Sequence, residues 1–172
     1  GNDAAYTVAV NVARIVAENT KLSDREAVNY FCGLMNEYAK MIGASSSHFT
    51  SPEGWHAADH YSTPYDILLI TLNALENSEI AEIMSMQSKY VVFASGHNIT
   101  WTNSNKLLDP EGEYFYEYAL AGKTGSTDEA GKCLVAVAEK NGKKILTVIM
   151  GCTDDDGRYN DTVALFRAML GK

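Results

Sequence analysis

The sequence has few basic residues, no basic cluster and no long apolar run. Its 14 lysines and arginines stand against 22 aspartates and glutamates, so the formal net charge is −8 at pH 7. A protein that binds nucleic acid through the phosphate backbone needs a positive surface, and this charge balance argues against that function. No apolar run is long enough to span a membrane, and no signal peptide is recognisable.

Cysteine is also sparse, with only Cys32, Cys133 and Cys152. The number is odd, and the spacings match neither a zinc site nor a redox pair. Cys32 falls on the apolar face of a predicted helix and Cys133 opens a predicted strand. We interpret both as small buried apolar residues and leave the role of Cys152 open.

Candidate metal ligands do not form a convincing motif. His56, Asp59 and His60 have a spacing that suits metal binding on a helix, but they fall in a loop-like segment, residues 44–62. The run Asp154-Asp155-Asp156-Gly157 lacks the alternating acids and the distal glutamate of a calcium loop, so we expect a solvated turn there. We therefore predict no metal and no cofactor.

What is present is typical of a globular domain, and its first half has the apolar spacing of helices. We predict that Asn2 and Asp3 cap the first helix and that Ser23 to Glu26 form a capping box for the second. The apolar face of the second helix, which includes Tyr30, Tyr38 and Met41, is predicted to lie in the core. The predicted helices cover about residues 2–16, 23–43, 63–75 and 78–86.

The second half has the short apolar runs and the period of two that indicate strands. Asn141-Gly142 is a strong hairpin signal, and residues 158–170 are predicted to form a closing helix. Helices followed by an antiparallel meander predict an α+β fold in one domain, helical over about 1–86 and sheet plus closing helix over about 87–172. The predicted strands are residues 90–93, 98–101, 118–123, 133–139 and 145–150.

A small, polar, glycine-punctuated stretch, residues 121–131, stands at the tip of a predicted buried strand. Lys123 offers a fixed cation, Thr124 offers a hydroxyl, and Gly125 allows a ligand to approach the backbone closely. The tripeptide is a weak signal by itself, because a turn with a solvated lysine has the same composition. The rest of the chain decides between a site and a plain turn.

Further blocks of sequence accompany this tripeptide. They are residues 1–5 (GNDAA), 47–54 (SHFTSPEG), 60–66 (HYSTPYD), 105–108 (NKLL) and 123–134 (KTGSTDEAGKCL). In content and order they resemble the serine D-alanyl-D-alanine carboxypeptidases, the low-molecular-mass penicillin-binding proteins with a β-lactamase/transpeptidase-like fold. Residues 1–5 resemble the segment after the serine of that family's Ser-x-Asn motif. The resemblance covers nearly the whole chain.

The chain departs from the family in one respect. The family nucleophile lies in a Ser-x-x-Lys motif, and no serine of this chain is followed three residues later by lysine. The resemblance therefore implies the C-terminal part of a catalytic domain, truncated at the N-terminus. We expect the chain alone to be inactive.

The resemblance implies catalytic roles for Asn2, Lys123 and Ser126. Asn2 would hydrogen-bond the side amide of the substrate. Lys123 would supply positive charge beside the nucleophile and the substrate carboxylate. The backbone N–H of Ser126 would be one oxyanion donor, since acyl transfer needs a nucleophile, a base and an oxyanion hole.

It also implies substrate-binding roles for Thr124, Gly125, Thr127 and Arg158. The Thr124 hydroxyl would position the substrate carboxylate, and Gly125 would keep the strand edge open. Thr127 lies next to the site. Arg158 stands where the family often has an arginine that reaches the terminal carboxylate, a task suited to a planar two-point donor.

The implied partner is a peptidoglycan stem peptide or a β-lactam, and the implied location is extracytoplasmic, in the bacterial cell envelope or secreted. Two alternatives remain: a non-catalytic relative that binds cell-wall peptide or a partner, and a β-lactamase-like hydrolase fragment. No glutamate-bearing deacylation motif supports the last.

A final expectation concerns assembly. In the family the last strand pairs with strands from the N-terminal part, which this chain lacks. Here the last predicted strand, residues 145–150, is apolar, uncharged and free of proline. An exposed edge of that composition recruits another chain. We expect a homodimer in which two copies of residues 145–150 pair antiparallel.

Overall fold

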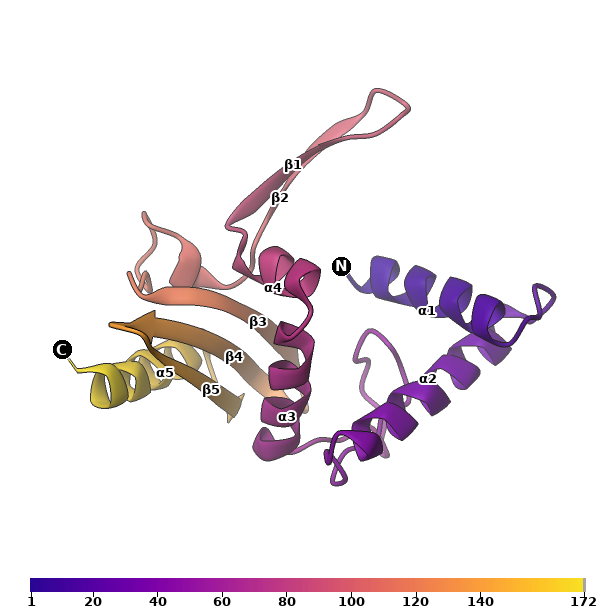
Figure 1. Ribbon diagram of the computed structural model, residues 1–172, viewed down its shortest axis with the longest axis horizontal. Coiled ribbons are helices and arrows are strands. Elements are labelled where there is room, and N and C mark those ends of the chain that lie inside the picture. The colour runs from indigo at the N-terminus through magenta and orange to yellow at the C-terminus, as the bar shows by residue number, and fades with distance from the viewer. Residues whose placement is uncertain (172) are drawn as a thin grey trace. The chain divides into compact units, whose positions relative to one another are not determined.

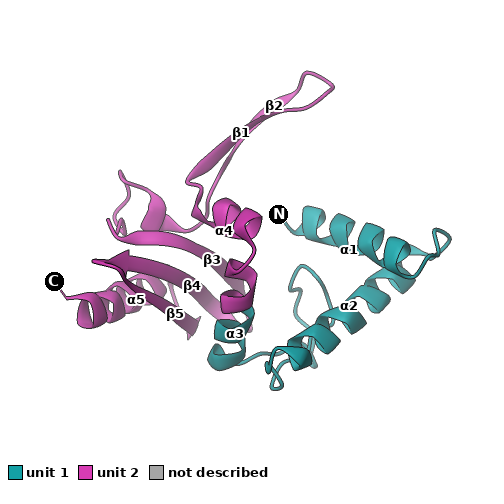
Figure 2. Cartoon of the chain, viewed as in Figure 1, with its two compact units in different colours: residues 1–70 teal, residues 71–172 magenta. Residues whose placement is uncertain are grey.

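The computed structural model describes residues 1–171, and its contacts divide the chain into two compact units, residues 1–70 and 71–172 (Figure 2). Helices and antiparallel strands are both present, so the predicted α+β class is confirmed. The elements, drawn in Figure 1, are α1 (Asn2–Val16), α2 (Asp24–Met41), α3 (Pro64–Leu75), α4 (Ser78–Ser85), β1 (Ser88–Val92), β2 (Asn98–Thr102), the 3₁₀ helix η1 (Lys106–Leu108), β3 (Ala119–Thr127), β4 (Gly131–Lys140), β5 (Lys143–Cys152) and α5 (Asp155–Leu170).

In the first unit α1 packs against α2 around Val10, Ala13 and Ala27. The predicted capping box at Ser23 and Glu26 is confirmed: the Glu26 N–H donates to Ser23 Oγ, and the Ser23 N–H donates to the Glu26 carboxylate. The predicted cap of α1 is wrong, because the N-cap is Gly1 and helix geometry already begins at Asn2. Asp3 instead places its carboxylate in the first turn, where the helix dipole favours negative charge.

The predicted core face of α2 is partly wrong. Tyr30, Tyr38 and Met41 are 40%, 49% and 71% exposed, whereas Ala27, Cys32 and Ala39 are buried. Small side chains allow neighbouring backbone to come close, and the larger ones stand outside that contact. The prediction that Cys32 is a buried apolar residue is confirmed.

The predicted loop, residues 44–62, lies between α2 and α3, and hydrogen bonds stabilise its conformation. The carboxylate of Asp66 is buried and accepts from the Ser46 N–H and the Ser47 hydroxyl, both at 2.7 Å. The Thr50 N–H donates to Nδ1 of His60 at 3.1 Å, which requires that nitrogen to be unprotonated. Burial lowers the pKa of His60, and nearby His48 adds to this effect.

The second unit contains two separate antiparallel sheets rather than the single predicted meander. β1 and β2 pair only with each other among the described strands, and β3, β4 and β5 form a sheet in that order. The hairpin predicted at Asn141-Gly142 is confirmed: Lys140 pairs with Lys143, and both turn residues have positive φ, as a tight hairpin turn requires. Residues 103–118, which separate β2 from β3, form turns and η1 rather than a strand.

Helix α5 covers one face of the three-stranded sheet and encloses the core of this unit. The fully buried side chains there include Leu107, Leu134, Tyr159 and Phe166. The helix begins at Asp155, earlier than predicted, because Asp154 is its N-cap and accepts the Gly157 N–H at 2.7 Å. Within residues 1–171 no helix has the length and apolar character that crossing a bilayer demands.

Candidate functional site

Strand β3 presents Lys123, Thr124 and Gly125 at the edge of its sheet. These residues pair with Val135, Leu134 and Cys133 of β4 on one side, and among the described residues no strand pairs with β3 on the other. Lys123 and Gly125 are exposed and Thr124 is half-buried. The site therefore has a free main-chain edge with a cation and a hydroxyl on it.

Two glycines of β3 differ in what surrounds them. A Cβ on Gly122 would lie 2.5 Å from Asn105 Nδ2 and 2.7 Å from the Val135 carbonyl oxygen, so the fold itself requires glycine there. A Cβ on Gly125 would meet nothing within 4 Å. The protein leaves open space at Gly125, as a site for a closely approaching ligand needs.

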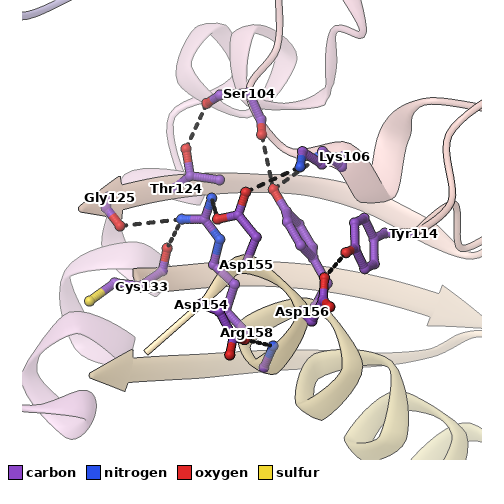
Figure 3. Close-up of polar contacts among 12 residues, drawn as sticks. Ser104, Lys106, Tyr114, Thr124, Gly125, Cys133, Asp154, Asp155, Asp156 and Arg158 are labelled. Atoms are coloured by element: carbon purple, nitrogen blue, oxygen red, sulfur yellow. Dashed lines mark hydrogen bonds and ion pairs between the residues drawn. The ribbon is translucent and has the colours of Figure 1, made fainter. Parts of the chain in front are cut away.

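The Thr124 hydroxyl lies 2.6 Å from the hydroxyl of Ser104, and either group can be the donor (Figure 3). Ser104 is itself held in place, because its carbonyl oxygen accepts a 3.0 Å hydrogen bond from the hydroxyl of Tyr159. Tyr159 is fully buried and also accepts from the N–H of Lys106. Thus α5 fixes the segment that contacts Thr124.

Arg158 is buried and connects α5 to two strands (Figure 3). Its guanidinium donates to the carbonyl oxygens of Gly125 at 3.3 Å and Cys133 at 3.1 Å. The same group forms an ion pair with Asp155 at 2.8 Å. The side chain therefore braces β3 at the position of Gly125.

The aspartate run before Arg158 is not the solvated turn that we predicted. Lys106 Nζ lies 3.1 Å from the carboxylate of Asp155; this hydrogen bond and the charge of Arg158 lower the pKa of Asp155. Tyr114 donates a hydrogen bond to Asp156, which raises the pKa of Tyr114 to about 12. The prediction failed because the partners come from residues 106–114, far away in the sequence.

Lys123 is exposed as a residue, yet its ammonium is partly enclosed by protein atoms. This burial lowers the pKa of Lys123, and the positive charge of Arg158 lowers it further. Its Nζ donates to the carbonyl oxygen of Thr124 at 2.5 Å. Two cations thus influence one stretch of β3, and an anionic ligand would relieve their repulsion.

The other predicted site residues are placed as follows. Ser126 is exposed on β3 opposite Lys132. The Thr127 hydroxyl accepts the Ala130 N–H at 3.0 Å and so serves the turn between β3 and β4. Asn2 is exposed in the first turn of α1, in the first unit, whereas the other predicted site residues belong to the second.

The sequence-based predictions do not identify Ser104, Lys106, Asp155 or Tyr159 as neighbours of the site. The block at residues 105–108 enters them only as part of the family resemblance. An aspartate three residues before a buried arginine on a helix is a usable signal for Asp155, since residues at that spacing face each other. Nothing local identifies Ser104 as a neighbour of Thr124, 20 residues away.

Known proteins are similar to this chain in both sequence and fold. A family model described as D-alanyl-D-alanine carboxypeptidase matches residues 1–154. The D-alanyl-D-alanine carboxypeptidase of Streptomyces sp. (strain K15) is 30% identical over 170 residues, which is 96% of this chain and 55% of that protein. DacC of Escherichia coli (strain K12) is 31% identical over 166 residues, 96% of this chain and 36% of that protein.

Solved structures agree with these relatives. The crystal structure of the Streptomyces K15 DD-transpeptidase is 29% identical and matches 96% of this chain and 61% of that chain with a TM-score of 0.83. A D-alanyl-D-alanine carboxypeptidase from Mycobacterium tuberculosis H37Rv is 26% identical, with a TM-score of 0.70 over 82% of this chain and 57% of that chain. This chain spans about half of the first relative and about a third of the second. It belongs to the D-alanyl-D-alanine carboxypeptidase family.

Proposed function

We propose that this chain forms the substrate-recognition part of a serine-type D-Ala-D-Ala carboxypeptidase that acts on peptidoglycan stem peptides. The observation that carries the proposal is the open edge of β3, with Lys123 and Thr124 beside the unobstructed Gly125. The relatives, which are named as D-alanyl-D-alanine carboxypeptidases, support the reaction class. A substrate of this kind is found outside the cytoplasm, so the proposed location is the cell envelope or the extracellular space.

The stem peptide would bind as an added strand on β3. Main-chain groups on a free sheet edge give affinity to an extended peptide, and side chains beside the edge give specificity. The open space at Gly125 allows the peptide backbone to approach closely. The Lys123 ammonium would attract the terminal carboxylate, and the Thr124 hydroxyl, oriented by Ser104, would donate to it.

Acyl transfer needs further groups. The backbone N–H of Ser126 is proposed as one oxyanion donor, and the Asn2 amide is proposed to hold the side amide of the substrate. No Ser-x-x-Lys is present in the chain, so the nucleophile and its base are not among these residues. We propose that the chain binds the peptide without being acylated by it.

Arg158 is proposed to act in two ways. Its charge favours an anion near Lys123, whose pKa it lowers. Its hydrogen bonds to the Gly125 and Cys133 carbonyls hold β3 in position. Direct contact with the terminal carboxylate, which the resemblance implies, would require the guanidinium to release one of these present partners.

Intact-mass analysis after incubation with a penicillin tests the catalytic half of the proposal. The expected result is an unchanged mass for this chain. An adduct that maps to one serine would overturn it and would point to Ser126. A longer form that contains Ser-x-x-Lys is tested in the same way. If it too binds the peptide without being acylated, the non-catalytic alternative is favoured. Acylation of that longer form followed by rapid hydrolysis of the penicillin would favour the β-lactamase-like alternative.

A further inference from the structure

The hairpin of β1 and β2 extends away from the rest of the second unit (Figure 1). Its turn is closed by a 2.8 Å hydrogen bond from the Phe93 N–H to the His97 carbonyl, and Gly96 has a φ of +84°. A two-stranded hairpin is only marginally stable in water unless its apolar side chains are covered. The exposed side chains of this hairpin therefore indicate which kind of surface covers it.

One face of the hairpin is apolar. Lys89 is paired with Trp101 and Val91 with Ile99, so these side chains share a face. Phe93 lies on the same face, since its ring meets that of Trp101 edge-to-face at 6.1 Å. Trp101 is 51% exposed, Phe93 45% and Ile99 41%. Large apolar side chains thus stand in solvent along the whole length of one face.

The apolar surface continues at the base of the hairpin. A hollow of about 500 Å³ lies there, lined among others by Ile83, Met86, Lys89 and Trp101. The opposite face has more polar side chains, with Thr100 paired to Tyr90 and Asn98 paired to Val92, although Tyr90 and Val92 are themselves exposed. The two faces therefore differ in polarity.

The charge of this segment differs from that of the chain. Between Glu82 and Asp109 there is no aspartate or glutamate, and this is the longest interval without one in a chain that has 22. Lys89 is the cation on the apolar face. A protein of net charge −8 is repelled by an anionic surface, and this segment is where that repulsion is weakest.

We propose that the β1–β2 hairpin is a membrane-contact element that binds the surface of a bilayer containing anionic phospholipid. Phe93 near the tip would enter the boundary between headgroups and acyl chains. Trp101 would lie at the headgroup level, where its amphipathic ring is favoured, and Lys89 would meet lipid phosphates. Along the hairpin, Phe93 lies nearer the tip, whereas Trp101 and Lys89 lie nearer the base.

The geometry limits the depth of insertion. Lys89 and Phe93 are about 13 Å apart at the rise of a strand. Interfacial elements bury their apolar face about 5–10 Å into the headgroup and acyl boundary. Among the described residues, no strand pairs with either outer edge of the hairpin. The unpaired backbone groups tolerate the hydrated interface but not the hydrocarbon core. The contact is therefore superficial and reversible.

The test uses the full chain with Trp55→Phe, which leaves Trp101 as the only tryptophan. Vesicles of phosphatidylglycerol mixed with phosphatidylethanolamine are compared with vesicles of phosphatidylcholine. The expected result is sedimentation with the anionic vesicles, a blue shift of Trp101 fluorescence and its quenching by brominated lipids. No binding, or binding without quenching, would overturn the proposal.

Two matched variants locate the contact. Phe93→Ser should weaken partitioning onto anionic vesicles about fivefold or more, whereas Val92→Ser, a more exposed neighbour on the opposite face, should leave it unchanged. Lys89→Glu should weaken it about fivefold or more at low salt. Equal losses for the two serine variants would contradict the assignment. So would Phe93-dependent self-association without vesicles, which would make a second copy the occupant. Both measurements are independent of peptide binding at β3.

Discussion

The hydroxyl groups of Ser104 and Thr124 lie 2.6 Å apart, although the two residues are 20 positions apart in the sequence. Ser104 lies in the loop between β2 and η1, and Thr124 is part of the exposed edge of β3. If Ser104 donates to Thr124, the proton of Thr124 is directed outward toward a ligand. This pair links the backbone fixed by Tyr159 to the proposed carboxylate site.

Ser104→Ala is therefore expected to weaken binding of an N-acyl-D-Ala-D-Ala peptide without changing the fold. The loss should be about 0.5–1.5 kcal/mol, the usual worth of one hydrogen bond. In a double-mutant cycle with Thr124→Val, the two losses should not add, because both remove the same interaction. Additive losses, measured by calorimetric titration, would show that Ser104 acts independently of Thr124.

Asp155→Asn should destabilise the second unit at pH 7. The pKa of Asp155 is lowered in the folded state, so its carboxylate stabilises the fold above the ordinary value of 3.8. That contribution is lost as pH falls through the lowered folded pKa. The partly exposed ion pair is worth about 1 kcal/mol, equivalent to about 2–4 °C in Tm. Asp161→Asn is the control. At pH 7, thermal unfolding should show a lowered Tm for Asp155→Asn but not for Asp161→Asn. If the Tm of Asp155→Asn were still lowered by the same amount at pH 2, the stabilisation would not depend on the charge of Asp155.

The first unit should lose stability when the pH falls from 7 to 5. The folded pKa of His60 is below the unfolded value of 6.5, so the unfolded chain binds more protons in the window between them. Protonation also removes the acceptor of the Thr50 N–H. The protection factor of the Thr50 amide, which compares its exchange rate with the intrinsic rate at the same pH, should fall over this range. His60→Gln should remove most of the pH dependence. His97→Gln, in the β1–β2 turn, is the control; if it flattens the profile equally, His60 is not responsible.

A dimer through β5 remains a prediction. β5 is an edge strand among the described residues, and a two-fold pairing centred between Thr147 and Val148 would place Met150 opposite Ile145. That register avoids contact between the lysines at 143 and 144 of the two copies. Sedimentation equilibrium at micromolar concentration should reveal the dimer. Met150→Lys should weaken it, since the new cation would share a face with Lys143 of the second copy, diagonally across the strand pair. Met169→Lys on α5 should not weaken it. If the chain is a monomer at every concentration measured, the prediction is wrong.

Local pattern was sufficient for most elements of the fold. The capping box at Ser23, the turn at Asn141-Gly142 and all the predicted strands are present because each depends on neighbours within a few residues. The pattern did not reveal that β1 and β2 pair apart from the other strands, because alternation identifies a strand but not its partner.

The candidate site was predictable where a motif was contiguous, as along β3. It was not predictable where contacts join distant segments. The ion pair of Lys106 with Asp155 spans 49 residues, and the aspartates that were expected to be solvated cap α5 and bind Lys106, Arg158 and Tyr114 instead. Composition alone does not distinguish a solvated carboxylate from one that is hydrogen-bonded to a residue far away in the sequence.

The most direct measurement is a nuclear magnetic resonance titration of the ¹⁵N-labelled chain with N-acetyl-D-Ala-D-Ala and with its C-terminal amide. The account predicts shifts at residues 123–126 with the free acid, much weaker shifts with the amide, and loss of the difference in Lys123→Met. Because the pKa of Lys123 is lowered, the preference for the acid should fade as pH rises through that pKa, below the ordinary lysine value of 10.5. Equal shifts with acid and amide, or shifts confined to residues outside β3, would contradict the proposal that this strand recognises the terminal carboxylate.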